Sequence, residues 1–175
     1  AVCPIARPEL MAAFAPLRRL LTTLDDVPEE IALTAYAEGL EVVPIGGAVP
    51  RLADRERLAA WAEEVDVARI AVASDAAMPA EPLAVRRRPS LAWDGLRVAP
   101  PPLAFLQATA EAEAFLQERV ATAVAGAARV LDLFAGVGTL TAAARAAGAR
   151  VEAVEQDPAA AAALAAGAPK VAVET

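Results

Sequence analysis

Residues 129–140, RVLDLFAGVGTL, have the residue types and spacing of a nucleoside-binding loop. A run of strand-forming apolar residues ends there in two closely spaced glycines, Gly136 and Gly138. Glycines between a strand and a helix let the backbone turn sharply and let a ligand approach without meeting a Cβ atom. Glu155 ends the next apolar run, 17 residues after Gly138. A carboxylate at this place accepts hydrogen bonds from ribose hydroxyls, so the pattern predicts half of a nucleoside site.

Two classes of cofactor use this layout. A dinucleotide site has the pattern G-x-G-x-x-G, in which helix amides bind a pyrophosphate. The third glycine position is Thr141 here, so that pattern is incomplete. S-Adenosylmethionine has no phosphate, and its loop typically carries an acidic residue ahead of the glycines, where this chain has Asp132. The residues alone also leave open a plain strand-to-helix turn beside an acidic residue.

The elements around the loop alternate between helix and strand. Thr109 is a predicted cap followed by acidic residues, and Asp157-Pro158 places a cap before a proline at the first helical position. Such alternation predicts a parallel sheet with crossover helices, and the glycine loop at the carboxyl end of a strand. The expected elements are a helix at 109–125, a strand at 129–134, a helix at 138–147, a strand at 150–155, a helix from 157 and a strand at 170–174.

Residues 1–98 carry a different mixture of elements. Leucines and a phenylalanine recur at helical spacing over 10–24, where Pro16 is expected to kink or divide the helix. Two strands are expected around a tight Glu38-Gly39 turn, followed by an amphipathic helix at 54–65 and a strand at 67–74. Near the end of this region, SLAWDGLRV predicts a hairpin with an Asp94-Gly95 turn.

Composition and charge exclude several classes of protein. The chain has 175 residues, of which 57% are apolar and 22% charged, as in globular rather than disordered proteins. No apolar run approaches the roughly 20 residues of a membrane span, and no secretory pattern is present, so we expect a cytoplasmic protein without a membrane partner. A single cysteine allows no internal disulfide, and the lack of histidine removes the commonest general base. A net charge of −7 does not favour binding of nucleic acid through bulk electrostatics.

Three motifs resemble the RNA uracil-5 methyltransferases, which methylate C5 of uridine in ribosomal or transfer RNA. The motifs are FLQATAEAEAFLQERV, VLDLFAGVGTL and VEAVEQD, against the family pattern F-x-Q-x-N, a helix, D-L-[FY]-C-G-x-G and a strand ending in V-E. The resemblance covers 99–175 and, more weakly, the stretch before it. It implies an α/β fold, with a small α+β central domain at 1–98 and, at 99–175, the first half of a Rossmann-like class I methyltransferase domain.

The resemblance implies S-adenosylmethionine as the cofactor. Gln107 matches the family glutamine that contacts the methionine part of the cofactor, and Glu155 matches the ribose carboxylate. As a strand-end carboxylate facing a cleft, Glu155 is expected to support little of the core. The other cofactor-binding residues implied lie in the loop: Phe134, Gly136, Gly138 and Thr139. The chain departs from the frequent family residues at three positions: Thr109 for Asn, Ala135 for Cys and Thr139 for Asn.

The N-terminal segment AVCPIARPEL resembles the family segment C-P-x-x-x-P-x-L. In cluster-containing members its cysteine is the last of four ligands of an iron–sulfur cluster, and Cys3 matches that metal ligand. The other three ligands have no match in this chain, and one thiolate cannot hold a cluster. We therefore expect an iron–sulfur cluster only in a full-length parent.

The resemblance also implies an RNA substrate, with rRNA favoured over tRNA, acted on by the full-length parent. Family chemistry uses a cysteine thiolate that adds to uracil C6 and a carboxylate that removes the C5 proton. No residue here matches either group, so no catalytic residue is assigned. We expect an internal piece of a longer methyltransferase, in which the strand at 129–134 is left as an apolar edge.

Two other functions remain open on the residues alone. One is a nicotinamide-dependent oxidoreductase, which would bind a pyrophosphate at 136–139. The other is a non-catalytic interaction module that uses the acidic surface and the basic run Arg86, Arg87 and Arg88. For that run we expect a solvated strand edge rather than a phosphate contact on RNA.

Overall fold

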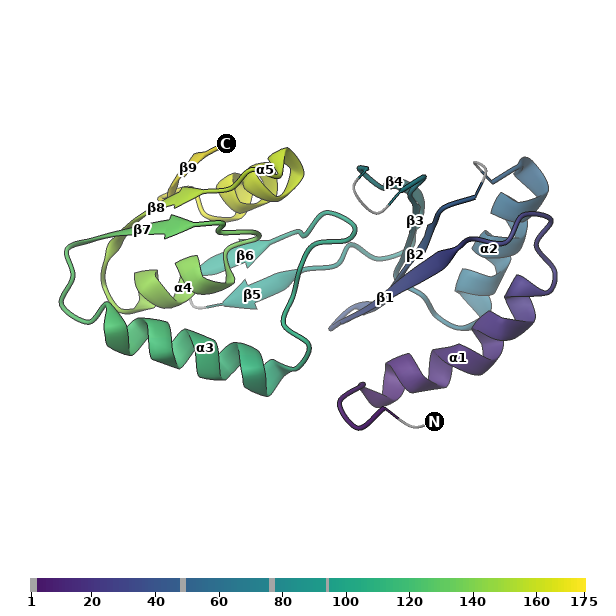
Figure 1. Ribbon diagram of the computed structural model, residues 1–175, viewed down its shortest axis with the longest axis horizontal. Helices are drawn as coiled ribbons and strands as arrows, with labels where there is room; N and C mark the ends of the chain where they lie inside the picture. Colours follow the sequence, from purple (N-terminus) through teal and green to yellow (C-terminus); the bar gives the residue numbers. More distant parts are fainter. Residues whose placement is uncertain (1–2, 48–49, 76–77, 94) are drawn as a thin grey trace. The chain divides into compact units, whose positions relative to one another are not determined.

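The computed structural model describes residues 3–47, 50–75, 78–93 and 95–175, and the chain forms two compact units, Ala1–Pro89 and Ser90–Thr175 (Figure 1). Among the described residues, no helix has the length and apolar character needed to cross a membrane. The elements are α1 (Pro8–Leu21), β1 (Glu30–Tyr36), β2 (Gly39–Ile45), α2 (Leu52–Glu64), β3 (Arg69–Val72), β4 (Glu81–Val85), β5 (Leu91–Trp93), β6 (Leu96–Val98), α3 (Ala110–Ala123), β7 (Arg129–Leu133), α4 (Thr139–Ala146), β8 (Arg150–Val154), α5 (Pro158–Gly167) and β9 (Ala172–Glu174).

The first unit contains a four-stranded sheet in the order β1-β2-β3-β4. β1 and β2 form an antiparallel hairpin, β2 and β3 are parallel and connected through α2, and β4 returns antiparallel to β3. Gly39, with a φ of +123°, pairs with Tyr36, so the two turn residues are Ala37 and Glu38. The turn therefore lies one residue earlier than the sequence predicted.

The core of the first unit lies between the sheet and its two helices. Leu17 and Leu20 of α1 pack with Leu58 and Trp61 of α2 against one face of the sheet. α1 runs as one helix from Pro8 to Leu21 with Pro16 inside it. Division of the helix at Pro16, one of the two expected effects of this proline, does not occur. Burial of the Leu side chains compensates for the backbone hydrogen bond that a proline removes.

Two arginines of the basic run hold the turns of the first unit together. Arg86 and Arg87 both bind the carboxylate of Asp66, at 2.9 and 2.8 Å. Arg86 also donates to the carbonyl of Val67 and Arg87 to the carbonyl of Glu38, which ties the β1–β2 turn to the α2–β3 turn. Arg86 and Arg87 thus lie partly exposed directly after the edge strand β4, as expected, and their guanidinium groups also bind within the fold.

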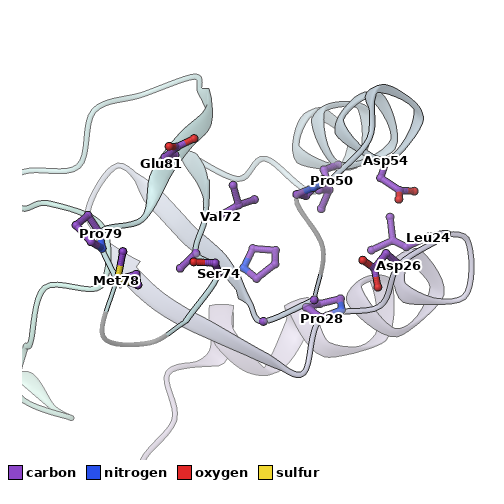
Figure 2. A pocket seen from close by; sticks show the side chains of 15 residues that line it. Leu24, Asp26, Pro28, Pro50, Asp54, Val72, Ser74, Met78, Pro79 and Glu81 are labelled. Carbon is purple, nitrogen blue, oxygen red and sulfur yellow. The ribbon is translucent and has the colours of Figure 1, made fainter.

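A cavity of about 190 Å³ lies at the carboxyl ends of the parallel strands β2 and β3 (Figure 2). Asp26 and Asp54 lie at one end of it, and Met78 and Glu81 at the other. The Asp54 carboxylate accepts a hydrogen bond from the Asp25 amide at 3.1 Å and pairs with Arg57 at 2.7 Å. Asp54 therefore fastens the loop after α1 to the first turn of α2.

The second unit is built on the parallel sheet β7-β8-β9, and the expected alternation of helix and strand is confirmed. Thr109 caps α3 by accepting from the Ala112 amide, and Asp157 caps α5 by accepting from the Ala159 amide, as predicted. Ala142 of α4 and Leu164 of α5 meet Ala153 of β8 in the core.

The hairpin β5–β6 packs within this second unit. Leu96 of β6 joins the core around Leu164, so the division between the units falls after Pro89 and not at the expected 98/99 boundary. β5 and β6 pair antiparallel as predicted, with Trp93 opposite Leu96. Asp94 of the predicted Asp94-Gly95 turn lies outside the described residues.

β7 is the end strand of the described sheet, as predicted. Asp132 points to the side of α4, where it binds Thr141, so Leu131 and Leu133 point to the opposite face. The two residues are 58% and 57% exposed. Strands of parallel sheets are ordinarily covered on both faces, so this strand leaves unusual apolar surface in solvent.

Candidate functional site

The glycine loop connects β7 to α4, and its backbone is left-handed at three positions. The φ angles are +57° at Phe134, +57° at Gly136 and +98° at Gly138. Phe134 holds a conformation that costs a non-glycine residue about 1–2 kcal/mol, and the residue is 80% exposed. The loop therefore presents an aromatic side chain outward from the carboxyl end of the sheet.

The two glycines serve different purposes. A Cβ atom at Gly136 would have no neighbour within 4 Å, so this part of the loop faces open space. A Cβ atom at Gly138 would lie 2.5 Å from Cδ1 of Leu164, which is fully buried in α5. Gly136 leaves open space beside the loop, whereas Gly138 allows α4 to approach α5.

Glu155 fastens the loop from the end of β8. Its Oε2 accepts a hydrogen bond from the Gly136 amide at 2.6 Å, and its Oε1 accepts one from the Asp157 amide at 2.8 Å. The residue is only 8% exposed. This corrects the expectation of a carboxylate that supports little of the structure, because Glu155 holds the glycine loop and the start of α5 together.

Asp132, the acidic residue ahead of the glycines, is hydrogen-bonded to α4. The Thr141 hydroxyl donates to its Oδ2 at 2.5 Å, and Thr141 is fully buried. Burial raises the pKa of Asp132 above its ordinary value, and the hydrogen bond from Thr141 opposes this rise only in part. Ionisation of Asp132 in the folded chain therefore costs stability.

Asp132→Asn is expected to raise the melting temperature by a few degrees at pH 7. The amide oxygen still accepts from Thr141, and no charge has to be buried. Because the folded-state pKa is raised, the wild type loses stability as pH rises from about 4 through that pKa, while the variant does not titrate. Thermal unfolding between pH 3.5 and 7.5 should show the two chains equal at the acidic end and diverging above it. If the melting temperatures of the two chains differ by the same amount at every pH, the buried charge of Asp132 is not the cause of the difference.

Gln117 is a part of the site that the sequence did not indicate. Its Nε2 donates to the carbonyl of Thr139 at 3.0 Å, which joins α3 to the first residue of α4. A glutamine on an exposed helix has no local signature that would have singled it out. The structure brings Thr139 together with Phe134, Gly136, Gly138 and Glu155 around the loop.

Two of the predicted site residues are not tied to this loop. Gln107 is partly buried in the irregular segment ahead of α3, and among the described residues no hydrogen bond joins it to the loop. Cys3 is exposed, in the segment before α1. Within the part of the chain that the structure describes, no group of three or more His, Cys, Asp or Glu residues could hold a metal ion.

The parallel strands, the glycine loop and the strand-end glutamate define a Rossmann-like unit of the methyltransferase type. No family model matches the chain. It is 35% identical over 157 residues to an uncharacterized RNA methyltransferase of Rhizobium meliloti (strain 1021), covering 89% of this chain and 36% of that protein. It is 34% identical over 146 residues to the 23S rRNA (uracil(1939)-C(5))-methyltransferase RlmD of Aeromonas salmonicida (strain A449), covering 79% and 32%. The resemblance to RNA methyltransferases is confirmed.

Solved structures confirm the fold. The tRNA (uracil-54, C5)-methyltransferase of Pyrococcus abyssi, in complex with S-adenosyl-L-homocysteine, superposes with a TM-score of 0.73 over 99% of this chain and 48% of that chain, at 14% identity. The tRNA m1G37 methyltransferase of M. jannaschii superposes with a TM-score of 0.57 over 96% and 52%, also at 14% identity. The chain spans between 32% and 38% of the length of the curated relatives it matches.

Proposed function

We propose that this chain is part of an RNA methyltransferase that methylates C5 of uridine, and that its second unit binds S-adenosylmethionine. The observation that carries the proposal is the buried Glu155 carboxylate, held at the end of β8 against the amide of Gly136. The Glu155 carboxylate is therefore a hydrogen-bond acceptor beside a loop in which Gly136 faces open space. The similarity to the Aeromonas salmonicida uracil-C5 enzyme supports the choice of reaction.

The residues present fit an adenosyl cofactor. Each carboxylate oxygen of Glu155 accepts one backbone N–H and keeps a second lone pair, so both can accept from ribose hydroxyls. Gly136 leaves space at the loop, and the exposed ring of Phe134 offers an apolar surface beside it. Gln107 and Thr139 complete the proposed set of cofactor contacts. The bound cofactor would supply the electrophilic methyl group.

S-Adenosylhomocysteine is expected to bind more tightly than NADH, because the loop lacks the third glycine of a pyrophosphate site and has Thr141 there. Isothermal titration of both ligands into the chain measures the difference. Tighter binding of NADH would overturn the methyltransferase proposal and favour an oxidoreductase.

For the RNA substrate we propose a ribosomal uridine, on the basis of the similarity to the 23S rRNA enzyme. No residue of this chain matches the family nucleophile or base, so the chain by itself should leave unmodified rRNA and tRNA unlabelled when incubated with methyl-labelled cofactor. The longer parent is expected to label rRNA at uridine C5. Labelling of tRNA alone by that parent would exclude the ribosomal assignment.

A further inference from the structure

α3 lies against α4 with one face half-buried, and two side-chain hydrogen bonds attach it to other parts of the second unit. None of the 14 residues of this helix is buried. Two side chains on one face, four positions apart, attach it: Glu113 accepts from Nε1 of Trp93 at 2.8 Å, and Gln117 donates to the Thr139 carbonyl at 3.0 Å. The first contact reaches the hairpin, and the second reaches the glycine loop.

The first turn of α4 depends on contacts from outside the helix. Its N-cap is Gly138, which has no side chain to satisfy the free amides of the first turn. Side chains from three other segments bind the loop and this turn at other groups. Glu155 binds the Gly136 amide, Asp132 binds the Thr141 hydroxyl, and Gln117 binds the Thr139 carbonyl. Of these three, Gln117 alone belongs to a helix, because Asp132 lies in β7 and Glu155 directly follows β8.

We propose that Gln117 is a positioning residue of the cofactor site. Its amide keeps the Thr139 carbonyl in place, and thereby keeps the first turn of α4 and the left-handed Gly138 in the arrangement that the ligand meets. A loop already ordered in the free chain costs less to order on binding, so the contact strengthens ligand affinity without touching the ligand. The proposal rests on the adenosyl site proposed above.

The test compares Gln117→Ala with Glu113→Ala, which removes the other attachment of the same helix face. Gln117→Ala is expected to weaken S-adenosylhomocysteine binding about two- to tenfold, the range that corresponds to one neutral hydrogen bond. In the ligand-free chain it should also speed hydrogen exchange of the amides at 138–142. Glu113→Ala removes only the contact with Trp93 and, because the Gln117 contact is kept, should leave both quantities at their wild-type values. Gln117→Glu keeps the shape without the amide donor and should behave as Gln117→Ala.

The two readouts separate this inference from the proposed function. If the wild type binds S-adenosylhomocysteine and Gln117→Ala binds it equally well, Gln117 does not position the site. If the wild type does not bind the ligand, the adenosyl site itself is refuted, and exchange at 138–142 in the free chain still decides whether Gln117 orders the loop. If Gln117→Ala and Glu113→Ala change hydrogen exchange equally, Gln117 only attaches α3 to the unit, as Glu113 does, and the positioning role is wrong.

Discussion

Gly138→Ala is expected to lower the free energy of unfolding of the second unit by about 2–5 kcal/mol. Two costs add in this number. A φ of +98° is strained for any residue with a Cβ atom, and the new atom would lie 2.5 Å from Cδ1 of Leu164 in the core between α4 and α5. Leu164 is fully buried and cannot move without displacing its neighbours. Urea unfolding followed by Trp93 fluorescence, in a Trp61→Phe background, reports on this unit.

Gly148 provides a matched control at the other end of α4. Its φ is +92°, and a Cβ atom there would have no neighbour within 4 Å. Gly148→Ala should therefore show the backbone cost alone, about 1–2 kcal/mol. The difference between the two variants isolates the contact with Leu164. If both variants lose equal stability, Gly138 is required only for its backbone angle.

Glu155→Ala is expected to reduce both stability and ligand affinity. Removal of the carboxylate leaves the Gly136 and Asp157 amides without their acceptor, at a cost of about 2–4 kcal/mol for the two donors. The affinity for S-adenosylhomocysteine should fall by about tenfold or more, since charge-assisted bonds to the ribose are lost as well. Urea unfolding and isothermal titration measure the two losses.

Asp157→Ala is the internal control for Glu155. Asp157 caps α5 through a hydrogen bond from the Ala159 amide at 2.9 Å, so its loss should cost about 1 kcal/mol of stability and little affinity. Glu155→Gln should lie between the wild type and Glu155→Ala, because one of its two terminal atoms becomes a donor that faces a backbone amide. If Asp157→Ala weakens binding and Glu155→Ala does not, Glu155 is not the ribose ligand.

The order of elements in the second unit was predictable because its signals are local. Apolar runs, the Asp157-Pro158 cap and the glycines each act within a few residues, and β7, α4 and β8 lie within a residue of their expected bounds. The identity of Glu155 as a strand-end carboxylate follows from the same local pattern. The amide partner of its Oε2 does not, because Gly136 comes from another strand end.

Contacts between distant segments account for what the sequence did not reveal. The need for glycine at 138 depends on Leu164, which follows 26 positions later and lies in another helix. The roles of Arg86 and Arg87 depend on Asp66, which the chain brings near only when β4 pairs with β3. Such partners are set by packing in three dimensions, which no local pattern encodes.

The exposed leucines of β7 also govern the colloidal stability of the chain, that is, whether it stays dispersed or aggregates. An open, apolar end strand is a template for pairing with other chains, and Leu131 and Leu133 supply the attractive surface. The net charge of −7 opposes such encounters at long range, and added salt screens that repulsion while leaving the apolar attraction intact. Dilute, low-salt buffers are therefore the conditions that keep this chain dispersed, and salting a preparation will promote its precipitation.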